Sequence, residues 1–486
     1  MKLFFLGLVI LLCGYFFYGK LVERILGPDD RETPAKRLHD GVDFVVLPHW
    51  KNMLIQLLNI AGVGPVIGVI LGIKFGVIAF VIIPIGNIIG GAVHDFLSGM
   101  MSLRSDGANL PRLIKENIGQ KFYFVFSCFM IFLLLLVVAV FINIPAQLVD
   151  GMVPGRPVFW IAVVGIFVYY IAATLFPVDK IIGSLYPLFG GLLILGTLAI
   201  FVAMLFKLQS APQLLDQSAA FTEKMFTAQK GQPLIPMLFV TIACGIMSGF
   251  HATQSPIIAR TMSSERQARA SFYGMMVLEG AIGMIWAGAA LMIYNLFPAL
   301  MAKAPGAVLS DITGHFLGKY AGMITVLSVI ILAVTSGDTA MRSLRLSLAE
   351  ILNISQSKFY SRIMLCVPLI VIVSLLLWWS NKSAATFNQL WNYFAWGNQV
   401  LAASTLAAAT VWLGVRNKNC WIAWIPGAFM TFVVTTYILW ISPAHGGPLG
   451  FGLDLNHAYL FAGFIVLLIT FGLFEKIRRD IGETKL

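Results

Sequence analysis

Thirteen long apolar segments run along the chain, and they decide which solvent the folded protein occupies. A helix needs roughly 20 apolar residues to cross a bilayer. With 59% hydrophobic and only 11% charged residues, the composition excludes a water-soluble enzyme, a nucleic-acid-binding protein and a disordered chain. We therefore predict an all-α polytopic membrane protein in a lipid bilayer. The segments lie near residues 2–19, 52–73, 76–102, 121–149, 157–176, 185–206, 234–258, 272–297, 320–352, 361–380, 386–413, 421–441 and 458–474.

The first apolar segment follows Lys2 and is similar to the hydrophobic part of a signal peptide. No small-x-small cleavage site comes after it, because the chain continues Tyr15-Phe16-Phe17-Tyr18-Gly19-Lys20. A cleaved signal peptide carries such a site. We therefore expect this segment to be retained as the first transmembrane helix.

Lysines and arginines are distributed unevenly between the two sets of connecting loops. If the 20–51 loop is cytoplasmic, that side carries 24 of the 33 basic residues, counting helix ends and the C-terminal tail. Basic residues favour the cytoplasmic side of a membrane, so we predict an external N-terminus and a cytoplasmic C-terminus. The net charge of +11 is then a topology signal and does not indicate a nucleic-acid partner. Nothing in the sequence indicates an oligomeric state.

Two of the predicted helices contain interruptions rich in glycine and proline. The first is Asn59-Ile60-Ala61-Gly62-Val63-Gly64-Pro65, and the second runs from Gly245 to Pro256. Glycine favours unwinding and proline removes a backbone donor, while irregular backbone at membrane depth is tolerated where it lines a cavity. Interruptions at matching places in two halves point to the binding site of a transporter. The alternative is a pair of simple kinks, since both residues are common in membrane helices.

Each interruption opens a block of five predicted helices. The odd number places the two blocks in opposite orientations across the bilayer, so we predict a 5+5 inverted-repeat core. The blocks are residues 52–206 and 234–413, joined by an external loop at 207–233. A helix with a cytoplasmic loop (1–51) precedes them, and two helices with a cytoplasmic tail (414–486) follow.

Ionisable side chains inside membrane spans are costly and are therefore candidate functional groups. Asp338, together with Thr335 and Ser336, offers oxygen atoms that suit a proton or a small hard cation. The alternative is a structural ion pair with Arg342, which follows four residues later on the same helical face.

A second candidate is the pair His94-Asp95, near the cytoplasmic end of its predicted helix. Histidine can change its charge near neutral pH, which suits a proton relay. The alternative is that the pair contacts Arg104 or another arginine of the inner face. Glu279 is a lone carboxylate within the 272–297 segment and is either a coupling group or the partner of an arginine.

His251 and Gln254 lie inside the second interruption. Two hydrogen-bonding side chains beside open backbone suit a small polar or zwitterionic solute, and the free N–H groups of a half-helix would face a carboxylate. The alternative is that His251 only packs against backbone. The predicted substrate site lies between the two interruptions, and its further members are Asn59, Gly62, Gly64 and Ser248.

Several motifs occur in a fixed order along the chain. They are Gly27-Pro28-Asp29-Asp30, Thr33-Pro34-Ala35, Asp40-Gly41-Val42-Asp43-Phe44, Asn59 to Pro65, Gly91-Ala92-Val93-His94-Asp95-Phe96 with Ser98-Gly99-Met100, Ala252-Thr253-Gln254-Ser255-Pro256 with Ala259-Arg260, and Thr335 to Ala340 with Arg342 and Arg345. Over about residues 14–415 the chain thereby resembles the carbon starvation protein A family of bacterial membrane transporters. The resemblance implies peptide uptake during nutrient limitation, with close relatives that carry pyruvate together with protons.

The resemblance also implies kinship to the amino acid–polyamine–cation transporters, with their LeuT-type core, and a place in the bacterial inner membrane. In LeuT-type carriers the first core helix and the third helix of the second repeat commonly form a cation site. On this chain that implicates backbone around Ala61 and Gly64 together with Thr335, Ser336 and Asp338.

The sequence thus predicts a secondary active transporter that imports small peptides by proton or cation symport. It would need no cofactor beyond a transported proton or Na⁺, and no metal-ligand or ATP-binding motif is present. The alternatives are a symporter of pyruvate or an amino acid, a channel, a starvation sensor, and a membrane-embedded enzyme with Asp95 and Asp338 as an aspartyl pair. The enzyme is disfavoured because the chain lacks G-x-G-D, H-E-x-x-H and G-x-S-x-G motifs.

Overall fold

A computed structural model describes most of the chain. The described residues are 1–61, 64–153, 155–175, 178–303, 305–356, 358–445 and 447–484, without the side chains of 178–189, 243–244, 384–385, 388 and 484. Across these ranges every regular element is a helix and none is a strand, which confirms the predicted all-α class.

Within the described residues, the N-terminal part and the first predicted block form fifteen helical elements. They are α1 (Lys2–Cys13), η1 (Gly14–Tyr18), α2 (Gly19–Leu26), α3 (Pro34–Arg37), α4 (His49–Ile60), η2 (Gly64–Gly68), α5 (Val69–Gly72), η3 (Ile73–Phe75), α6 (Ala79–Gly86), η4 (Asn87–Gly91), α7 (Ala92–Arg104), α8 (Leu110–Asn117), α9 (Gln120–Met152), α10 (Phe159–Leu175) and α11 (Val178–Ser210). The elements from α1 to α2 make one continuous helix, as do those from α6 to α7.

The connecting loop, the second block and the C-terminal part continue the bundle. They comprise η5 (Pro212–Leu215), α12 (Ala219–Ala228), α13 (Leu234–Thr241), α14 (Ala243–Ile246), α15 (Phe250–Ala259), η6 (Glu265–Gln267), η7 (Arg269–Gly274), α16 (Met275–Leu296), η8 (Pro298–Ala302), α17 (Pro305–Ile351), α18 (Phe359–Ser380), α19 (Ala384–Val415), α20 (Trp421–Trp440), η9 (Pro443–His445) and α21 (Leu455–Thr484). Helix α17 is bent at Gly318, where φ is +74°.

All thirteen apolar segments of the sequence fall on helices, but not all on helices of full length. Ten helices of the described chain are long and apolar enough to cross a membrane, and a bent pair, α4 with η2–η3, would make eleven. The remaining two segments correspond to α10, which has 17 residues, and to the three short helices α13–α15.

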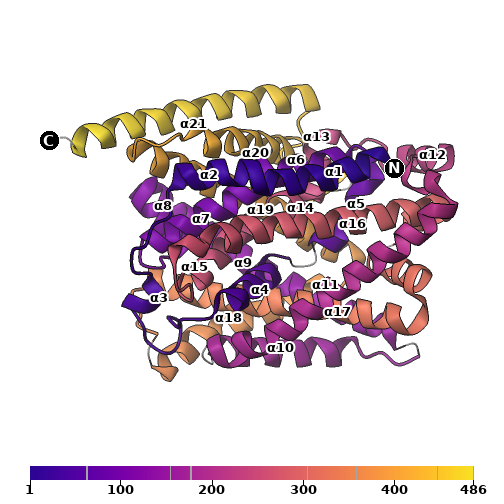
Figure 1. Ribbon diagram of the computed structural model, residues 1–486, viewed down its shortest axis with the longest axis horizontal. Coiled ribbons are helices and arrows are strands. Elements are labelled where there is room, and N and C mark those ends of the chain that lie inside the picture. Colours follow the sequence, from indigo (N-terminus) through magenta and orange to yellow (C-terminus); the bar gives the residue numbers. More distant parts are fainter. Residues whose placement is uncertain are drawn as a thin grey trace.

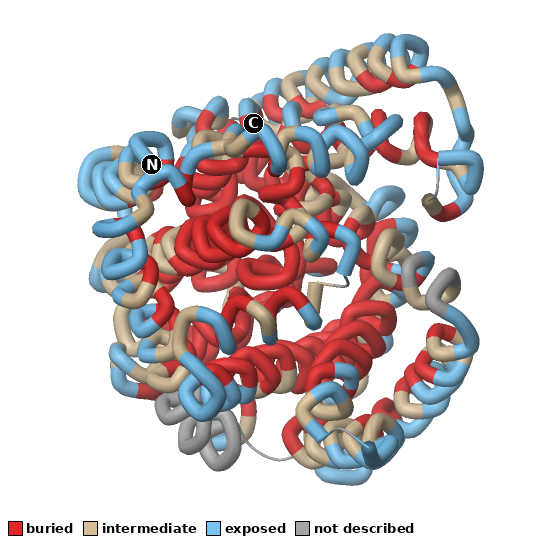
Figure 2. Tube along the Cα trace, turned by 90° about the vertical axis from the view of Figure 1, so that its right-hand side faces the viewer, coloured by how far each residue is buried: buried red, intermediate tan, exposed pale blue. Residues whose placement is uncertain are grey.

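The long helices lie nearly side by side, with α20 and α21 along one flank and α10 and α18 along the other (Figure 1). Seen along the helices, buried residues fill the middle of the bundle and exposed residues lie at its periphery (Figure 2). Many of the exposed side chains are large and apolar, among them Phe17, Ile161, Phe206, Leu460 and Phe471. Such a surface suits hydrocarbon better than water.

The N-terminus and the 207–233 loop lie on the same face of the molecule, as the predicted topology requires. The terminal ammonium of Met1 donates to the carbonyl of Leu215 at 3.0 Å and contacts Asp216. The C-terminus emerges at the opposite end (Figure 1). Which of the two faces is cytoplasmic stays a prediction from the charges.

Both predicted interruptions are real breaks, and the two broken helices pack on each other. Helix α4 ends at Ile60, and the following helix continues at an angle of 53°. Helices α4 and α15 are joined at the ends that lie away from the breaks. There, Asn52 of α4 and Thr261 after α15 exchange hydrogen bonds of 2.7 and 2.9 Å. The other halves, η2 with α5 and α13 with α14, also contact each other. This antiparallel pairing is what two blocks of opposite orientation predict.

The second break is shorter than the sequence predicts. Residues 247–249 are non-helical, whereas Phe250–Ala259 is regular helix with Pro256 inside it. The expectation of an unwound stretch through Pro256 is therefore wrong. Helix α15 packs against α4, α7 and α17. This packing keeps the segment helical, although Pro256 cannot donate a backbone hydrogen bond.

Gly249 allows the break to lie directly against α19. A Cβ atom at this position would meet the backbone nitrogen of Ala402 at 2.2 Å and the carbonyl oxygen of Asn398 at 2.3 Å. Both are main-chain atoms that cannot swing away, so even a methyl group would force the helices apart.

We expect Gly249→Ala to destabilise the fold by about 1–3 kcal/mol through this overpacking. Thermal unfolding of the purified protein, followed by fluorescence-detected size exclusion, measures the effect. Gly165→Ala is the matched control, because a Cβ atom there meets nothing within 4 Å and alanine favours a helix. Equal unfolding temperatures for the two variants would contradict the close approach.

Candidate functional site

A fully buried cluster of two histidines and two carboxylates lies beside the second break. Asp95 of α7 contacts two imidazoles: its Oδ1 is 2.9 Å from Nδ1 of His94, and its Oδ2 is 3.0 Å from Nδ1 of His251. On the far side of the ring, Nε2 of His251 is 3.8 Å from Oε2 of Glu279 on α16. All four side chains are completely buried. The structure thus brings together three separately predicted candidates: the pair His94-Asp95, His251 and Glu279.

The charge on this cluster depends on bound protons. With Asp95 ionised, both histidine Nδ1 atoms donate to it, which leaves their Nε2 atoms as acceptors when the rings are neutral. Two buried carboxylates facing neutral imidazoles would carry two uncompensated negative charges, which is expensive in a protein interior. One proton shared between His251 and Glu279 removes half of that charge, and the proton belongs to the pair rather than to one residue. The arrangement can therefore take up and release a proton.

Pairing with arginines of the inner face, the alternative for these residues, is not what the described contacts show. Arg104 instead forms an ion pair with Glu265, with Nε and Oε1 2.8 Å apart. Ser98 and Ser255 share a hydrogen bond of 2.7 Å that fastens α7 to α15. His251 is hydrogen-bonded to Asp95 of α7 and lies 3.8 Å from Glu279 of α16, so it does more than pack against backbone.

Asn398 of α19 caps the half-helix that begins after the second break. Its Oδ1 accepts from the Phe250 amide at 2.6 Å, and its carbonyl oxygen accepts from the Gly249 amide at 3.1 Å. Its side chain also bonds to Ser248 Oγ. The expected free N–H groups of this half-helix are thus partly occupied in this conformation. The sequence analysis missed Asn398; a pair of amides, Asn398-Gln399, within an apolar helix was the available signal.

Several buried amide side chains around the breaks lack hydrogen-bond partners among the described residues. Both polar atoms of Asn59 and of Gln56 on α4 are unpartnered, as are those of Gln399 on α19. Oε1 of Gln254 is unpartnered too, while its Nε2 donates to Thr253 at 2.8 Å. Unsatisfied buried polar groups are rare and mark places where a ligand or water bonds. Of the predicted substrate residues, Gly62 lies outside the described residues and Gly64 is buried in η2.

The predicted cation residues lie where α17 meets the end of α4. Ser336 Oγ donates to the carbonyl of Leu58 at 2.8 Å, and Thr335 Oγ1 donates to Leu332 at 2.9 Å. Ala61, the last described residue before the bend, is fully buried. Asp338 points elsewhere, since its Oδ2 accepts from Tyr169 of α10 at 2.5 Å. No cluster of three or more His, Cys, Asp or Glu residues suited to a metal ion occurs in the described part of the chain.

The loop before α4 is locked to α17 by a buried ion cluster. Asp43 lies 3.0 Å from Nη1 of Arg342 and 3.6 Å from Nη2 of Arg345, and both arginines are at most 1% exposed. Burial alone would raise the pKa of Asp43, but Arg342, Arg345 and Arg260 together lower it below its ordinary value. Sequence reasoning offered Asp338 as the partner of Arg342 and overlooked Asp43.

Comparison with known proteins places the chain in a family. The family model described as carbon starvation protein CstA matches residues 1–164, 151–313 and 296–437. The chain belongs to this family. A Haemophilus influenzae relative, described as an uncharacterized membrane protein, is 38% identical and aligns over 60% of this chain and 91% of its own length. The Escherichia coli peptide transporter CstA is 24% identical over 88% of this chain and 79% of its own length.

Other members of the CstA family align over less of their length. The Helicobacter pylori peptide transporter CstA is 26% identical, and the match covers 56% of this chain and 48% of that protein. The similarity in sequence therefore establishes that the chain belongs to the CstA family, whose relatives here are bacterial, and that it is a multi-pass membrane protein.

Two solved structures share the fold of this CstA family member. A mutant of the Eremococcus coleocola manganese transporter superposes with a TM-score of 0.55 at 14% identity, covering 91% of this chain and 99% of the other. MhsT in complex with L-phenylalanine gives a TM-score of 0.54 at 12% identity, covering 88% and 99%. The predicted LeuT-type transporter fold is thereby confirmed.

We expect Asp43→Asn to lower stability by about 3–5 kcal/mol, because it removes a buried carboxylate that contacts two buried arginines. Asp106→Asn, which removes the partner of Arg37 in an exposed ion pair on the same face, is the control and should cost less than about 1 kcal/mol. Thermal unfolding in detergent measures both. Similar losses in the two variants would show that the buried ion cluster contributes no more to stability than an exposed ion pair.

Proposed function

We propose that the protein is a secondary active transporter of the bacterial inner membrane that imports small peptides in symport with protons during carbon starvation. The observation that carries the proposal is the fully buried His94–Asp95–His251–Glu279 cluster next to two broken helices. The family membership, with relatives named peptide transporters, supports a membrane transporter and a peptide as cargo.

The proposed substrate site lies between the breaks, where Gln56, Asn59, Gln254 and Gln399 present unpartnered amide groups. A short peptide has amide and carboxylate groups that complement such side chains. Its binding would satisfy polar groups that are otherwise costly to bury. Ser248 and His251 flank this region at the second break.

The proposed coupling step is proton binding at the cluster. His251 is the second residue of α15, so a change in its charge acts directly on the half-helix next to the substrate site. A proton lowers the repulsion between Asp95 and Glu279 and favours one conformation of α7, α15 and α16, and its release to the cytoplasm favours the other. Asp43 with Arg342 and Arg345 would hold the cytoplasmic face closed until then.

Pyruvate or an amino acid as cargo, and Na⁺ as coupling ion, remain the alternative proposals. A Na⁺ site near Ala61, Thr335 and Ser336 would need the Ser336 hydroxyl to give up its hydrogen bond to Leu58. The aspartyl-enzyme reading has no support from the contacts, because Asp95 bonds to histidines and Asp338 to a tyrosine.

Uptake into proteoliposomes tests the coupling. Glu279→Gln removes an ionisable group from the cluster, so we expect accumulation of dialanine driven by an inward proton gradient to fall about tenfold or more, with exchange across equal pH retained. Glu223→Gln, on the exposed face of α12, is the control and should transport normally. Gradient-driven uptake that persists in Glu279→Gln, or that follows Na⁺ alone, would overturn proton coupling at this cluster.

Thermal-shift measurements rank the cargo. A ligand at ten times its Kd stabilises the folded state by about 1.4 kcal/mol. At one common concentration the ligand with the lowest Kd stabilises most, and we expect this to be dialanine rather than pyruvate or alanine. The same series at several pH values, with and without Na⁺, identifies the coupling ion. Stabilisation by pyruvate alone would replace the peptide with a keto acid as cargo.

A further inference from the structure

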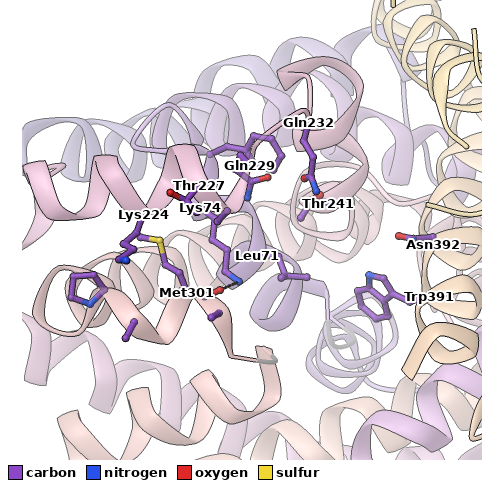
Figure 3. A pocket seen from close by; sticks show the side chains of 15 residues that line it. Leu71, Lys74, Lys224, Thr227, Gln229, Gln232, Thr241, Met301, Trp391 and Asn392 are labelled. Carbon is purple, nitrogen blue, oxygen red and sulfur yellow. Dashed lines mark hydrogen bonds between the residues drawn. The ribbon is translucent and has the colours of Figure 1, made fainter. Parts of the chain in front are cut away.

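A pocket of about 720 Å³ opens on the face that carries the N-terminus, apart from the buried cluster. Its wall combines the outer half-helices of both broken spans, through Leu71 and Thr241, with α12, η8 and α19 (Figure 3). Pockets that bind small molecules usually measure about 300–1,000 Å³. The size therefore suits a small organic solute.

Two lysines line this pocket, and no aspartate or glutamate is among its lining residues. Lys74 is only 8% exposed. Its ammonium donates to the carbonyl of Met301 at 2.7 Å and lies 5.9 Å from the ring centre of Tyr294. Among the described residues no carboxylate lies within ion-pair distance of Lys74 or of Lys224. A buried ammonium bonded only to a neutral carbonyl keeps donors for an anion.

The remaining lining residues suit a solute with one charged end. Gln229 and Gln232 offer amide donors and acceptors, while Trp391 supplies a flat apolar wall (Figure 3). Lys224 lies on the exposed face of α12, so a second positive charge stands at the pocket mouth. Positive charges in a concave site raise the local concentration of anions.

We propose that this outer pocket is a carboxylate-binding site, in which Lys74 and Lys224 hold the carboxylate of a solute before it reaches the breaks. The inference rests on the proposed function, in that the solute is the transported one. It accounts for how a carboxylate is recognised while Asn398 occupies amides of the half-helix after the second break. The lysines are the specificity-determining residues of this site.

Binding of dialanine, its C-terminal amide and pyruvate to the full chain in lipid nanodiscs, measured by calorimetry in low salt, tests the proposal. We expect saturable binding of the two carboxylates and about tenfold weaker binding of the amide, as the loss of a charge-assisted hydrogen bond predicts. Lys224→Glu should raise the Kd of dialanine about tenfold. Lys230→Glu, an equally exposed lysine outside the pocket, should change it less than roughly twofold.

Lys74→Gln should weaken binding further, and Lys74→Arg should restore part of it because the charge returns. If Lys74→Gln fails to fold, Lys224→Glu still decides, since its side chain is exposed. An unchanged Kd in Lys224→Glu, equal binding of the amide, or no saturable binding of either carboxylate would each overturn the site.

The two proposals fail in different ways. Lysine-dependent carboxylate binding without proton-driven uptake would overturn the transport function and retain the carboxylate site. Proton-driven uptake with a KM that is the same in Lys224→Glu and Lys230→Glu would retain transport and remove this site from the path.

Discussion

The structure of this protein depends on hydrogen-bonding the backbone groups that are not helical at the two breaks in the bundle. Where α4 ends at Ile60 and where residues 247–249 interrupt the second span, lipid could not satisfy the open N–H and C=O groups. The structure solves this by placing the two breaks together and surrounding them with α7, α16, α17 and α19. Asn398 accepts a hydrogen bond from the Phe250 amide, and Ser336 donates one to the Leu58 carbonyl. These bonds replace some of those that an unbroken helix would supply. Polar chemistry at the centre of an apolar bundle follows from this requirement.

The same enclosure buries His94, Asp95, His251 and Glu279 together as one acid–imidazole cluster. Charges in a protein interior interact more strongly than the same charges in water, because the surroundings screen them less. Asp95 contacts both His94 and His251, so α7 and α15 share one electrostatic unit. Asp43 with Arg342 and Arg345 makes a second such unit at one face of the bundle. The lysines of the outer pocket lie at the other face. A solute would therefore meet positive charges at the pocket and the carboxylates of the buried cluster deeper in the bundle.

Sequence reasoning located the elements better than their contacts. The apolar segments and the first break were predicted at the correct places because hydropathy and glycine–proline content act locally. The second break was predicted to extend too far, to Pro256, since the tertiary packing of α15 overrides the preference of that proline. The pair His94-Asp95, His251 and Glu279 were singled out, yet only as three separate candidates. Asp43, Tyr169 and Asn398 were missed as partners, because each lies far along the chain from the residue it contacts.

The sequence by itself determined that this chain occupies a membrane, that it is helical, and that two of its helices are discontinuous. Those properties arise from the composition and spacing of neighbouring residues, and these act locally, whatever the rest of the fold is. Only the tertiary structure decided which ionisable groups meet. Asp95 and His251, which are in contact, lie 156 positions apart in the sequence. Asp43 and Arg342 lie 299 positions apart. Such contacts depend on how whole helices pack. The periodic pattern along one helix shows which of its faces is buried, but it does not identify the residue that packs against that face.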